Sequence, residues 1–330
     1  MFEIFKDSKF DFMGMRRIWI GVSLTLMVLS VAIVATKGIN WGVEFEGGAE
    51  VQLRYASKPD VETIRGVLGR AGFTQATVTT IGKPEENEVY VRVPLEKGAK
   101  DDDVAASVVR ALQSGPSAQG MTVRSQAYIG PAVGAELIQK AVWAILGSLA
   151  GMLVYIWIRF EFQWGLAAVV ALVHDTVITL GLFSLFGYEM SLPVVAAFLT
   201  LIGYSVNDTV VIFDRIRENR NARGGGVGQL SELINDSVNQ TLSRTVLTSL
   251  LTWIACLSIF ILGGPALRDF SFVLVVGIIV GSYSTIYIAS PILVMWQDWM
   301  RRRAAAKSGA GEAAPAQRPA TAKKVRAGKA

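Results

Sequence analysis

The sequence predicts an α-helical membrane protein with six transmembrane helices and a small α+β extracytoplasmic domain between the first two helices. Apolar residues make up 52% of its 330 residues, slightly more than is usual in a soluble protein. Charged residues are rare in six long apolar runs and common between them, as in chains that cross a membrane several times. The runs lack the alternating pattern of barrel strands, which favours helices.

Each apolar run is long enough to cross a bilayer, because about 20 helical residues span about 30 Å of hydrocarbon. Arg16 and Arg17 precede the first run, and no small-residue cleavage site follows it, so we expect this helix to be retained. The predicted spans are 18–35, 141–158, 162–186, 192–213, 246–262 and 270–296.

Lysine and arginine residues indicate the orientation of the chain. They gather before the first span, between the second and third, between the fourth and fifth, and after the sixth. These segments all lie inside if both termini are cytoplasmic, as the positive-inside bias requires. The chain then divides into a cytoplasmic N-terminus with the first helix (1–36), an extracytoplasmic domain (37–139), five helices (140–300) and a cytoplasmic tail (301–330). The basic residues are Lys6, Lys9, Arg16, Arg17, Arg159, Arg215, Arg217, Arg220, Arg223, Arg244, Arg301, Arg302 and Arg303.

The segment 37–139 has the pattern of a small independent domain. Asp60 is a suitable N-cap for a first helix, Gly72 can end that helix, and aspartates at 101–103 suit the start of a second one. The resulting order β-α-β-β-α-β is ferredoxin-like. The predicted strands are 51–55, 76–81, 89–93 and 122–128.

The tail at 301–330 is rich in Ala, Gly, Pro and Lys and has no apolar periodicity, which predicts a disordered basic segment. A solvated cytoplasmic tail is favoured over a tail that contacts anionic lipid or ribosomal RNA. We therefore expect the lipid bilayer, and no nucleic acid, among the partners.

Asp208 is the most informative residue of the chain. It lies sixteen residues after Leu192, which places it roughly 24 Å from the start of its helix. A carboxylate inside a membrane span is costly and is usually functional. Tyr204, Ser205 and Asn207 lie close to it in the sequence, so we predict a polar strip that lines a buried relay or a water-filled seam. The structural alternative is a hydrogen bond to a neighbouring helix.

Two further residues could act with Asp208. Asp175, in the third span, is a candidate proton site or a partner for a polar group on another helix. His174 is adjacent to it, but adjacent residues on a helix face different directions, so we expect no simple dyad and favour a hydrogen bond from His174 to another helix. Arg244 opens the fifth run and, close to Asp208, would make a titratable site controlled by distance. Its alternative is snorkelling to the interface.

The chemistry-bearing residues favour proton-coupled transport over catalysis. A single cysteine, Cys256, and a single histidine, His174, cannot assemble a zinc site, and we expect no metal and no cofactor. Asp175 and Asp208 lie on different helices, as an intramembrane aspartyl protease requires, but neither lies in a G-x-G-D sequence. We therefore expect the protein not to be an enzyme. A purely structural scaffold would not need Asp208 and Arg244 inside the bilayer.

Four segments resemble one known family. The segment GYSVNDTVVIFDRIREN at 203–219 closely resembles the signature of the SecF family, the smaller six-helix subunits of the bacterial SecDF pair. VHD at 173–175, TLSRTVLTS at 241–249 and WGVEFEGG at 41–48 are similar to further motifs of that family. Glu44 stands where the family usually has aspartate, which keeps the charge. The family-motif residues singled out are Gly47, Gly48, Asp214 and Arg215.

The resemblance implies half of a twelve-helix unit of the RND superfamily, completed by SecD. It implies that this unit uses the proton motive force to promote preprotein export through the SecYEG channel in the bacterial inner membrane, with YajC and YidC as further partners. It also implies a proton path at the SecD–SecF interface that contains Asp208 and Arg244. The alternative is a stand-alone proton-coupled exporter of small molecules or lipids, although such pumps usually carry twelve helices in one chain.

Overall fold

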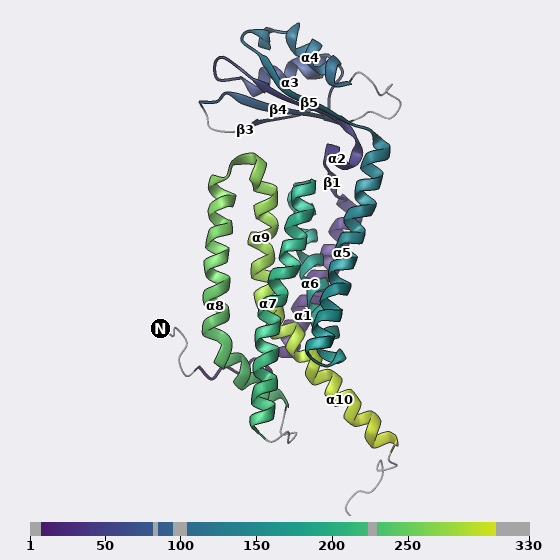
Figure 1. Cartoon of the computed structure of the whole chain (residues 1–330), viewed down its shortest axis with the longest axis vertical. Helices are drawn as coiled ribbons and strands as arrows, with labels where there is room; N and C mark the ends of the chain where they lie inside the picture. Colours follow the sequence, from purple (N-terminus) through teal and green to yellow (C-terminus); the bar gives the residue numbers. More distant parts are fainter. Residues whose placement is uncertain (1–7, 82–84, 95–103, 224–229, 308–330) are drawn as a thin grey trace, which may run out of the picture.

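The structure, a computed structural model, describes residues 8–81, 85–94, 104–223 and 230–307. Figure 1 shows an elongated bundle of long helices with an α+β domain at one end, held between α1 and α5. Within the described residues, six helical segments are long and apolar enough to cross a membrane, and they coincide with the six predicted spans. The long helices are α1 (Arg16–Lys37), α5 (Pro131–Arg159), α6 (Phe162–Phe186), α7 (Leu192–Ala222), α8 (Leu230–Leu262), α9 (Gly264–Ser284) and α10 (Ser290–Lys307).

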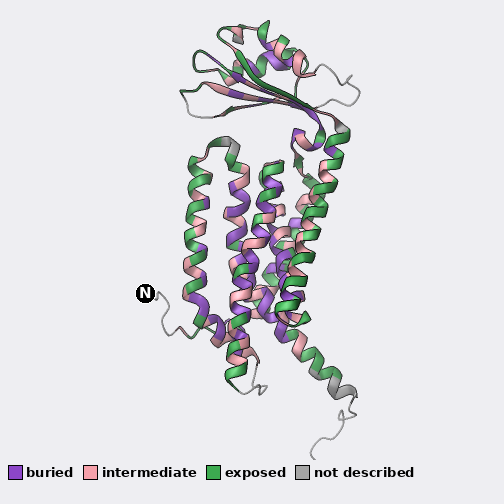
Figure 2. Ribbon diagram, viewed as in Figure 1, coloured by how far each residue is buried: buried purple, intermediate pink, exposed green. Residues whose placement is uncertain are grey.

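Burial divides the bundle into an inner and an outer set of helices (Figure 2). The most apolar windows of α6 and α7 are each 56% buried, and the window that runs from α9 into α10 is 72% buried. The corresponding windows of α1, α5 and α8 are 11%, 6% and 17% buried. The inner helices therefore have protein on most sides, whereas the outer helices present their apolar side chains to lipid.

The last span is interrupted by a π-helical segment, η3 (Thr285–Ala289), between α9 and α10. Its Thr285, Ile286, Ile288 and Ala289 are buried against neighbouring helices. Such segments often occur at functional sites because they change the register of the helix.

Several boundaries differ from the sequence prediction, among them the start of α5 at Pro131 instead of 141 and the end of α7 at Ala222 instead of 213. The helix α8 begins at Leu230, well before position 246, because its polar extension has a buried face of Ile234, Val238 and Leu242. The helix α9 begins at Gly264, where a link was expected up to position 269. The helix α10 continues to Lys307, so the prediction of a disordered tail is wrong for 301–307, where arginine, alanine and lysine favour helix. The rest of that tail, 308–330, lies outside the described residues.

The N-terminal segment lies across the start of α8. The side chain of Asn239 bonds to the backbone of Phe10 in both directions, accepting from its N–H at 3.0 Å and donating to its carbonyl at 2.9 Å. Asn235 accepts from the N–H of Met13 at 2.9 Å. Phe12 and Met13 are buried in the core at the base of the bundle. The segment is therefore an ordered strap that ties α1 to α8.

The α+β domain has the predicted ferredoxin-like fold. Its antiparallel sheet has the strand order β3-β4-β2-β5, and α3 and α4 pack on the sheet to enclose an apolar core. Asp60 caps α3 by accepting from the N–H of Glu62 at 3.1 Å, and Gly72 follows the helix with a φ of 95°. The predicted helix start at 101–103 lies outside the described residues. The elements are β2 (Gly48–Arg54), α3 (Val61–Arg70), β3 (Thr77–Ile81), β4 (Glu88–Pro94), α4 (Val104–Gln113), the 3-10 turn η2 (Pro116–Ala118) and β5 (Thr122–Ile129).

A compact joint connects this domain to the bundle. Strand β1 (Asn40–Trp41) pairs in parallel with β6 (Glu189–Met190), which lies in the link between α6 and α7. The short helix α2 (Val43–Glu46) follows β1 and ends at Gly47, whose φ is 83°. A side chain at Gly48 would collide with the carbonyl of Val93. Backbone freedom at Gly47 and close approach at Gly48 explain why two glycines occur here.

Candidate functional site

Two buried carboxylates lie on neighbouring inner helices of the bundle. Asp175 on α6 is 1% exposed and Asp208 on α7 is 4% exposed. Both were singled out from the sequence, and both point into the protein. They differ in what surrounds them.

Asp175 is held by three donors from three helices. Its Oδ2 accepts from the hydroxyl of Ser205 on α7 at 2.6 Å and from that of Ser284 on α9 at 2.9 Å. Its Oδ1 lies 2.9 Å from Nδ1 of His174. All four residues are buried. The carboxylate therefore joins the inner helices α6, α7 and α9.

The expectation that His174 and Asp175 form no dyad is wrong. Although adjacent residues leave a helix in different directions, the imidazole turns back so that its Nδ1 reaches the neighbouring carboxylate. The other ring nitrogen, Nε2, lies 3.1 Å from the hydroxyl of Tyr283 on α9, as expected for a histidine bonded to another helix. Tyr283 lies 3.3 Å from the hydroxyl of Ser23 on α1.

These contacts form one continuous chain of hydrogen bonds. With the imidazole proton on Nδ1, Ser23 donates to Tyr283, Tyr283 donates to His174, and His174 donates to Asp175. The chain runs from the outer helix α1 to the centre of the bundle. No residue of it except Asp175 was assigned to a relay from the sequence, since periodicity does not show which helices are neighbours.

Among the described residues, Asp208 has one hydrogen-bond donor, the hydroxyl of Ser249 on α8, at 3.0 Å. Two buried hydroxyls on the same helix faces, those of Tyr204 and Thr245, have no partner within the described residues. Tyr204 precedes Asp208 by four residues and Thr245 precedes Ser249 by four, so each lies one helical turn away on the same face. The seam between α7 and α8 therefore contains a carboxylate and two unsatisfied polar groups.

Arg244 lies near this seam but is not bonded to Asp208. It is exposed on α8, and no ion pair joins the two residues within the described chain. Arg244 is five residues before Ser249, which corresponds to about 7.5 Å along the helix toward the base. Asn207 on α7 and Thr248 on α8 are exposed as well. Together these residues form a polar stripe on the outside of the bundle: Asn207, Arg244 and Thr248.

The predicted lining of Asp208 is thus corrected at two positions. Ser205 donates its hydroxyl to Asp175 instead, because it faces the inner side of α7. Asn207 faces outward. Tyr204 keeps its predicted face, and its hydroxyl is the unsatisfied one described above.

A cluster of ion pairs, which includes the family-motif residues Asp214 and Arg215, lies at the far end of α7. Asp214 accepts from Arg159 at 3.0 Å and lies 3.5 Å from Arg217, while Arg215 pairs with Glu218 at 2.7 Å. These side chains are partly or largely exposed, so each pair contributes at most about 1 kcal/mol.

A second charged cluster, which the sequence analysis missed, lies in the joint below the α+β domain. Arg92 on β4 bonds to Glu189 on β6 at 2.8 Å and lies 3.3 Å from Glu50 on β2. The N–H of Glu189 donates to Asp269 on α9 at 3.0 Å. Glu44 on α2 also approaches Arg92. In the sequence, only two signals could have indicated this cluster: the alternation of apolar and polar residues in β4, and the acidic residue Glu189 in the short link between two spans.

Burial governs the titration of this cluster. Desolvation raises the pKa of both Glu44 and Glu189, although the charge of Arg92 acts in the opposite direction. Tyr90 donates to Glu50 at 2.5 Å, and desolvation together with that carboxylate raises the pKa of Tyr90 to about 12. Among the described residues, no group of three or more His, Cys, Asp or Glu side chains is arranged to hold a metal ion.

Six membrane spans, an inserted ferredoxin-like domain and buried carboxylates on inner helices define a multi-pass membrane protein of the transport class. A family model described as "Protein export membrane protein SecD/SecF, C-terminal" matches residues 111–299, and one described as "SecD/SecF GG Motif" matches residues 32–58. The chain belongs to the SecD/SecF family of protein export membrane proteins, and it is an inner-membrane protein.

Curated relatives and solved structures support the same family assignment. The chain is 43% identical over 291 residues to the protein translocase subunit SecF of Desulfurispirillum indicum, covering 87% of this chain and 91% of the relative. It is 40% identical to that of Calditerrivibrio nitroreducens, covering 90% and 97%. The crystal structure of SecDF from Thermus thermophilus matches with a TM-score of 0.74 and 38% identity. This match covers 90% of the chain but 40% of that structure.

Proposed function

We propose that this chain is the SecF subunit of a bacterial protein translocase, which pairs with SecD and uses the proton motive force to promote preprotein export through SecYEG. The observation that carries the proposal is the polar stripe of Asn207, Arg244 and Thr248 on the outer side of the α7–α8 seam, beside buried Asp208. The solved SecDF chain, of which this chain covers 40%, supports a partner with the remaining helices.

The polar stripe requires a cover in the membrane. An arginine at the bilayer centre costs about 3 kcal/mol on insertion scales, and Arg244, near the inner end of its span, bears only part of this cost. Snorkelling reduces this cost but leaves Asn207 and Thr248 in contact with hydrocarbon. A protein surface that supplies hydrogen bonds and an acidic group would stabilise all three residues. A helix of SecD is the proposed cover, which makes the site complete only in the complex.

In this proposal, Asp208 exchanges a proton between the two sides of the membrane. When ionised, it attracts the guanidinium of Arg244 into the seam, where the hydroxyls of Tyr204 and Thr245 lack partners. When protonated, it releases Arg244 toward the SecD surface. Asp175 is a further relay candidate from the sequence, but its three donors favour a role in holding the inner helices together.

The energy available matches a conformational change of this kind. One elementary charge that crosses a potential of 100 mV supplies about 2.3 kcal/mol. Coupling free energies between two protein conformers are usually about 1–3 kcal/mol. One proton per cycle would therefore be enough to shift the packing of α7 against α8 and SecD.

The proposed topology places both termini in the cytoplasm and the α+β domain outside, with the compartments divided at 37–139 and after position 300. It follows from the basic residues at the base of the bundle. The further partners proposed from family resemblance are YajC and YidC. The role is transport, without catalysis or cofactor, and no nucleic acid takes part.

Export into vesicles tests the relay. We expect Asp208→Asn to fold and to co-purify with SecD, but to lose the part of preprotein export that depends on the proton gradient. Arg244→Met should give a similar loss. Asp236→Asn is the matched control, because Asp236 makes an exposed ion pair with Arg223 at the base of α8. Gradient-dependent export at the wild-type rate in Asp208→Asn would refute the relay.

Co-purification separates the proposal from the alternative of a stand-alone exporter. A SecF subunit should be recovered with a six-helix partner from native membranes, and that partner should protect a cysteine placed at Thr248 from a thiol reagent. A chain that pumps protons and small molecules alone in vesicles would instead support the exporter.

A further inference from the structure

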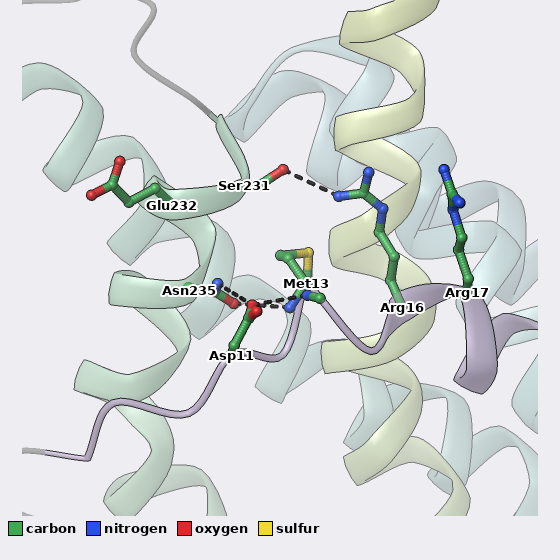
Figure 3. A pocket seen from close by; sticks show the side chains of 8 residues that line it. Asp11, Met13, Arg16, Arg17, Ser231, Glu232 and Asn235 are labelled. Carbon is green, nitrogen blue, oxygen red and sulfur yellow. Dashed lines mark hydrogen bonds between the residues drawn. The ribbon is translucent and has the colours of Figure 1, made fainter.

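A cavity of about 500 Å³ lies at the base of the bundle, at the end opposite the α+β domain. It is open on one side and is bordered by the N-terminal strap, the start of α1 and the first turns of α8 (Figure 3). Its volume is within the range of small-molecule sites. No residue of the proposed relay lines it. Its polar lining includes Asp11, Arg16, Arg17, Ser231, Glu232 and Asn235.

One side of the cavity is cationic. The side chains of Arg16 and Arg17 both line the cavity at the start of α1 (Figure 3). Arg16 donates to the hydroxyl of Ser231 at 3.2 Å. Within the described residues, neither arginine makes an ion pair, and Arg17 is exposed. Two guanidinium groups that line one cavity are suited to hold a phosphate group.

The other side of the cavity is anionic. The Oδ1 of Asp11 accepts from the N–H of Gly14 at 2.8 Å and from Asn235 at 2.7 Å, so this carboxylate holds the strap in place. These bonds lower the pKa of Asp11. Glu232 lies across the cavity from Arg17 (Figure 3) and makes no ion pair within the described chain. Two cations thus face two carboxylates, of which Glu232 is unengaged.

The rim of the cavity lies where α1 enters the membrane. Trp19 is one turn further along and stacks on Tyr287 with ring centroids 4.8 Å apart. Aromatic pairs of this kind are typical of the membrane–water interface. Met15 and Ile18 are 43% and 69% exposed beside the cavity and continue into the lipid-facing surface of α1. A ligand with a charged head and an apolar tail would contact both surfaces.

We propose that this cavity binds the headgroup of phosphatidylethanolamine from the adjacent leaflet. The phosphate diester lies on Arg16 and Arg17, the ammonium group lies on Glu232, and the acyl chains follow the exposed side of α1. Charge balance selects this lipid: a phosphatidylglycerol headgroup would satisfy the arginines but place no cation beside Glu232. The proposal is independent of the relay, because neither Asp208 nor Arg244 lines the cavity.

Native mass spectrometry of the purified full chain tests the site, with phosphatidylethanolamine and phosphatidylglycerol of the same acyl chains as probes. Loss of one charge-assisted hydrogen bond corresponds to about a tenfold loss of affinity, so Arg17→Gln should weaken binding of both lipids about tenfold. Glu232→Gln should weaken phosphatidylethanolamine binding alone. Arg302→Gln, which removes an exposed arginine near the end of α10, is the matched control and should have no effect.

Each other outcome would overturn the proposal. Equal affinity of the wild-type chain for the two lipids would show that Glu232 does not bind the ammonium group. An unchanged lipid preference in Glu232→Gln would show the same. An equal loss in Arg302→Gln would indicate diffuse surface charge. Soluble phosphoethanolamine or inorganic phosphate that competes at the concentration of the lipid would identify a free phosphate compound as the ligand. Equal thermal midpoints would show that Arg17→Gln and Glu232→Gln fold normally.

Discussion

Asp175 and Asp208 lie in the same bundle on neighbouring helices, yet their surroundings differ. Asp175 has three donors from α6, α7 and α9 and an extension through His174 and Tyr283 to α1. In the part of the chain that the structure describes, Asp208 has one donor, Ser249, and beside it are two hydroxyls without partners. Within that part, the polar groups of the first site are satisfied and those of the second are not.

This difference separates structure from function. A buried carboxylate held by three donors fixes the groups around it, because a change leaves donors unsatisfied. A buried carboxylate with few bonds can exchange partners at a lower cost. The inner site therefore suits a role in holding the bundle together, and the site at the α7–α8 seam suits a role in movement against a second subunit.

The largest expected effect separates the two carboxylates by stability. Asp175→Ala should lower the free energy of unfolding by about 3 kcal/mol, because it leaves the donors of Ser205 and His174 unsatisfied in the interior and leaves Ser284 only the carbonyl of Gly281 on its own helix. Asp208→Ala should cost only about 1 kcal/mol, because it affects one donor. Thermal midpoints of the two purified variants provide the measurement. Similar midpoints would remove the distinction between the sites.

A smaller effect on stability is expected at Tyr283, which lies near the α1 end of the hydrogen bonds that lead to Asp175. Tyr283→Phe keeps the ring but leaves Nε2 of His174 without its partner, so it should cost about 1 kcal/mol and leave gradient-dependent export intact. The control is Tyr287→Phe, which keeps the ring that stacks on Trp19. If Tyr283→Phe lost gradient-dependent export but kept a normal thermal midpoint, the proton path would instead run through the hydrogen bonds of Tyr283, His174 and Asp175.

The smallest effect on stability is expected at the seam. Ser249→Ala removes the one donor of Asp208 and should change the free energy of unfolding by less than about 1 kcal/mol. Gradient-driven export should nevertheless fall several-fold, because the carboxylate loses the group that positions it. Ser258→Ala on the same helix is the control, since that hydroxyl bonds only to its own helix. Equal export rates in the two variants would argue against a role of the α7–α8 seam in gradient-driven export.

Much of the fold could be predicted from the sequence because its signals are local. Apolar runs determine the spans, and Asp60 and Gly72 mark the ends of α3 through capping and a positive φ. The extension of α8 was missed because its buried positions, Ile234, Val238 and Leu242, are separated by polar residues. The apolar average over that window is too low to suggest a membrane-associated helix.

The site was predictable only in part, for a physical reason. Asp175 and Asp208 are visible because charge is rare inside a span. Which helix each one faces depends on the packing of the bundle, and no local signal carries that information. Ser205 illustrates the point: it lies three residues from Asp208 in the sequence, but its hydroxyl bonds to Asp175 on another helix.

The joint below the α+β domain has a mechanical consequence. The chain connects this domain covalently to α1 and α5, which are outer helices. The polar contacts take another route, from Arg92 to Glu189 in the link between α6 and α7, and from there to Asp269 on α9. We therefore expect a rotation of the domain to reach α6 and α7, the helices that carry Asp175 and Asp208. The outer helices α1 and α5 would hold the domain in place, and the joint would couple its movement to the inner helices.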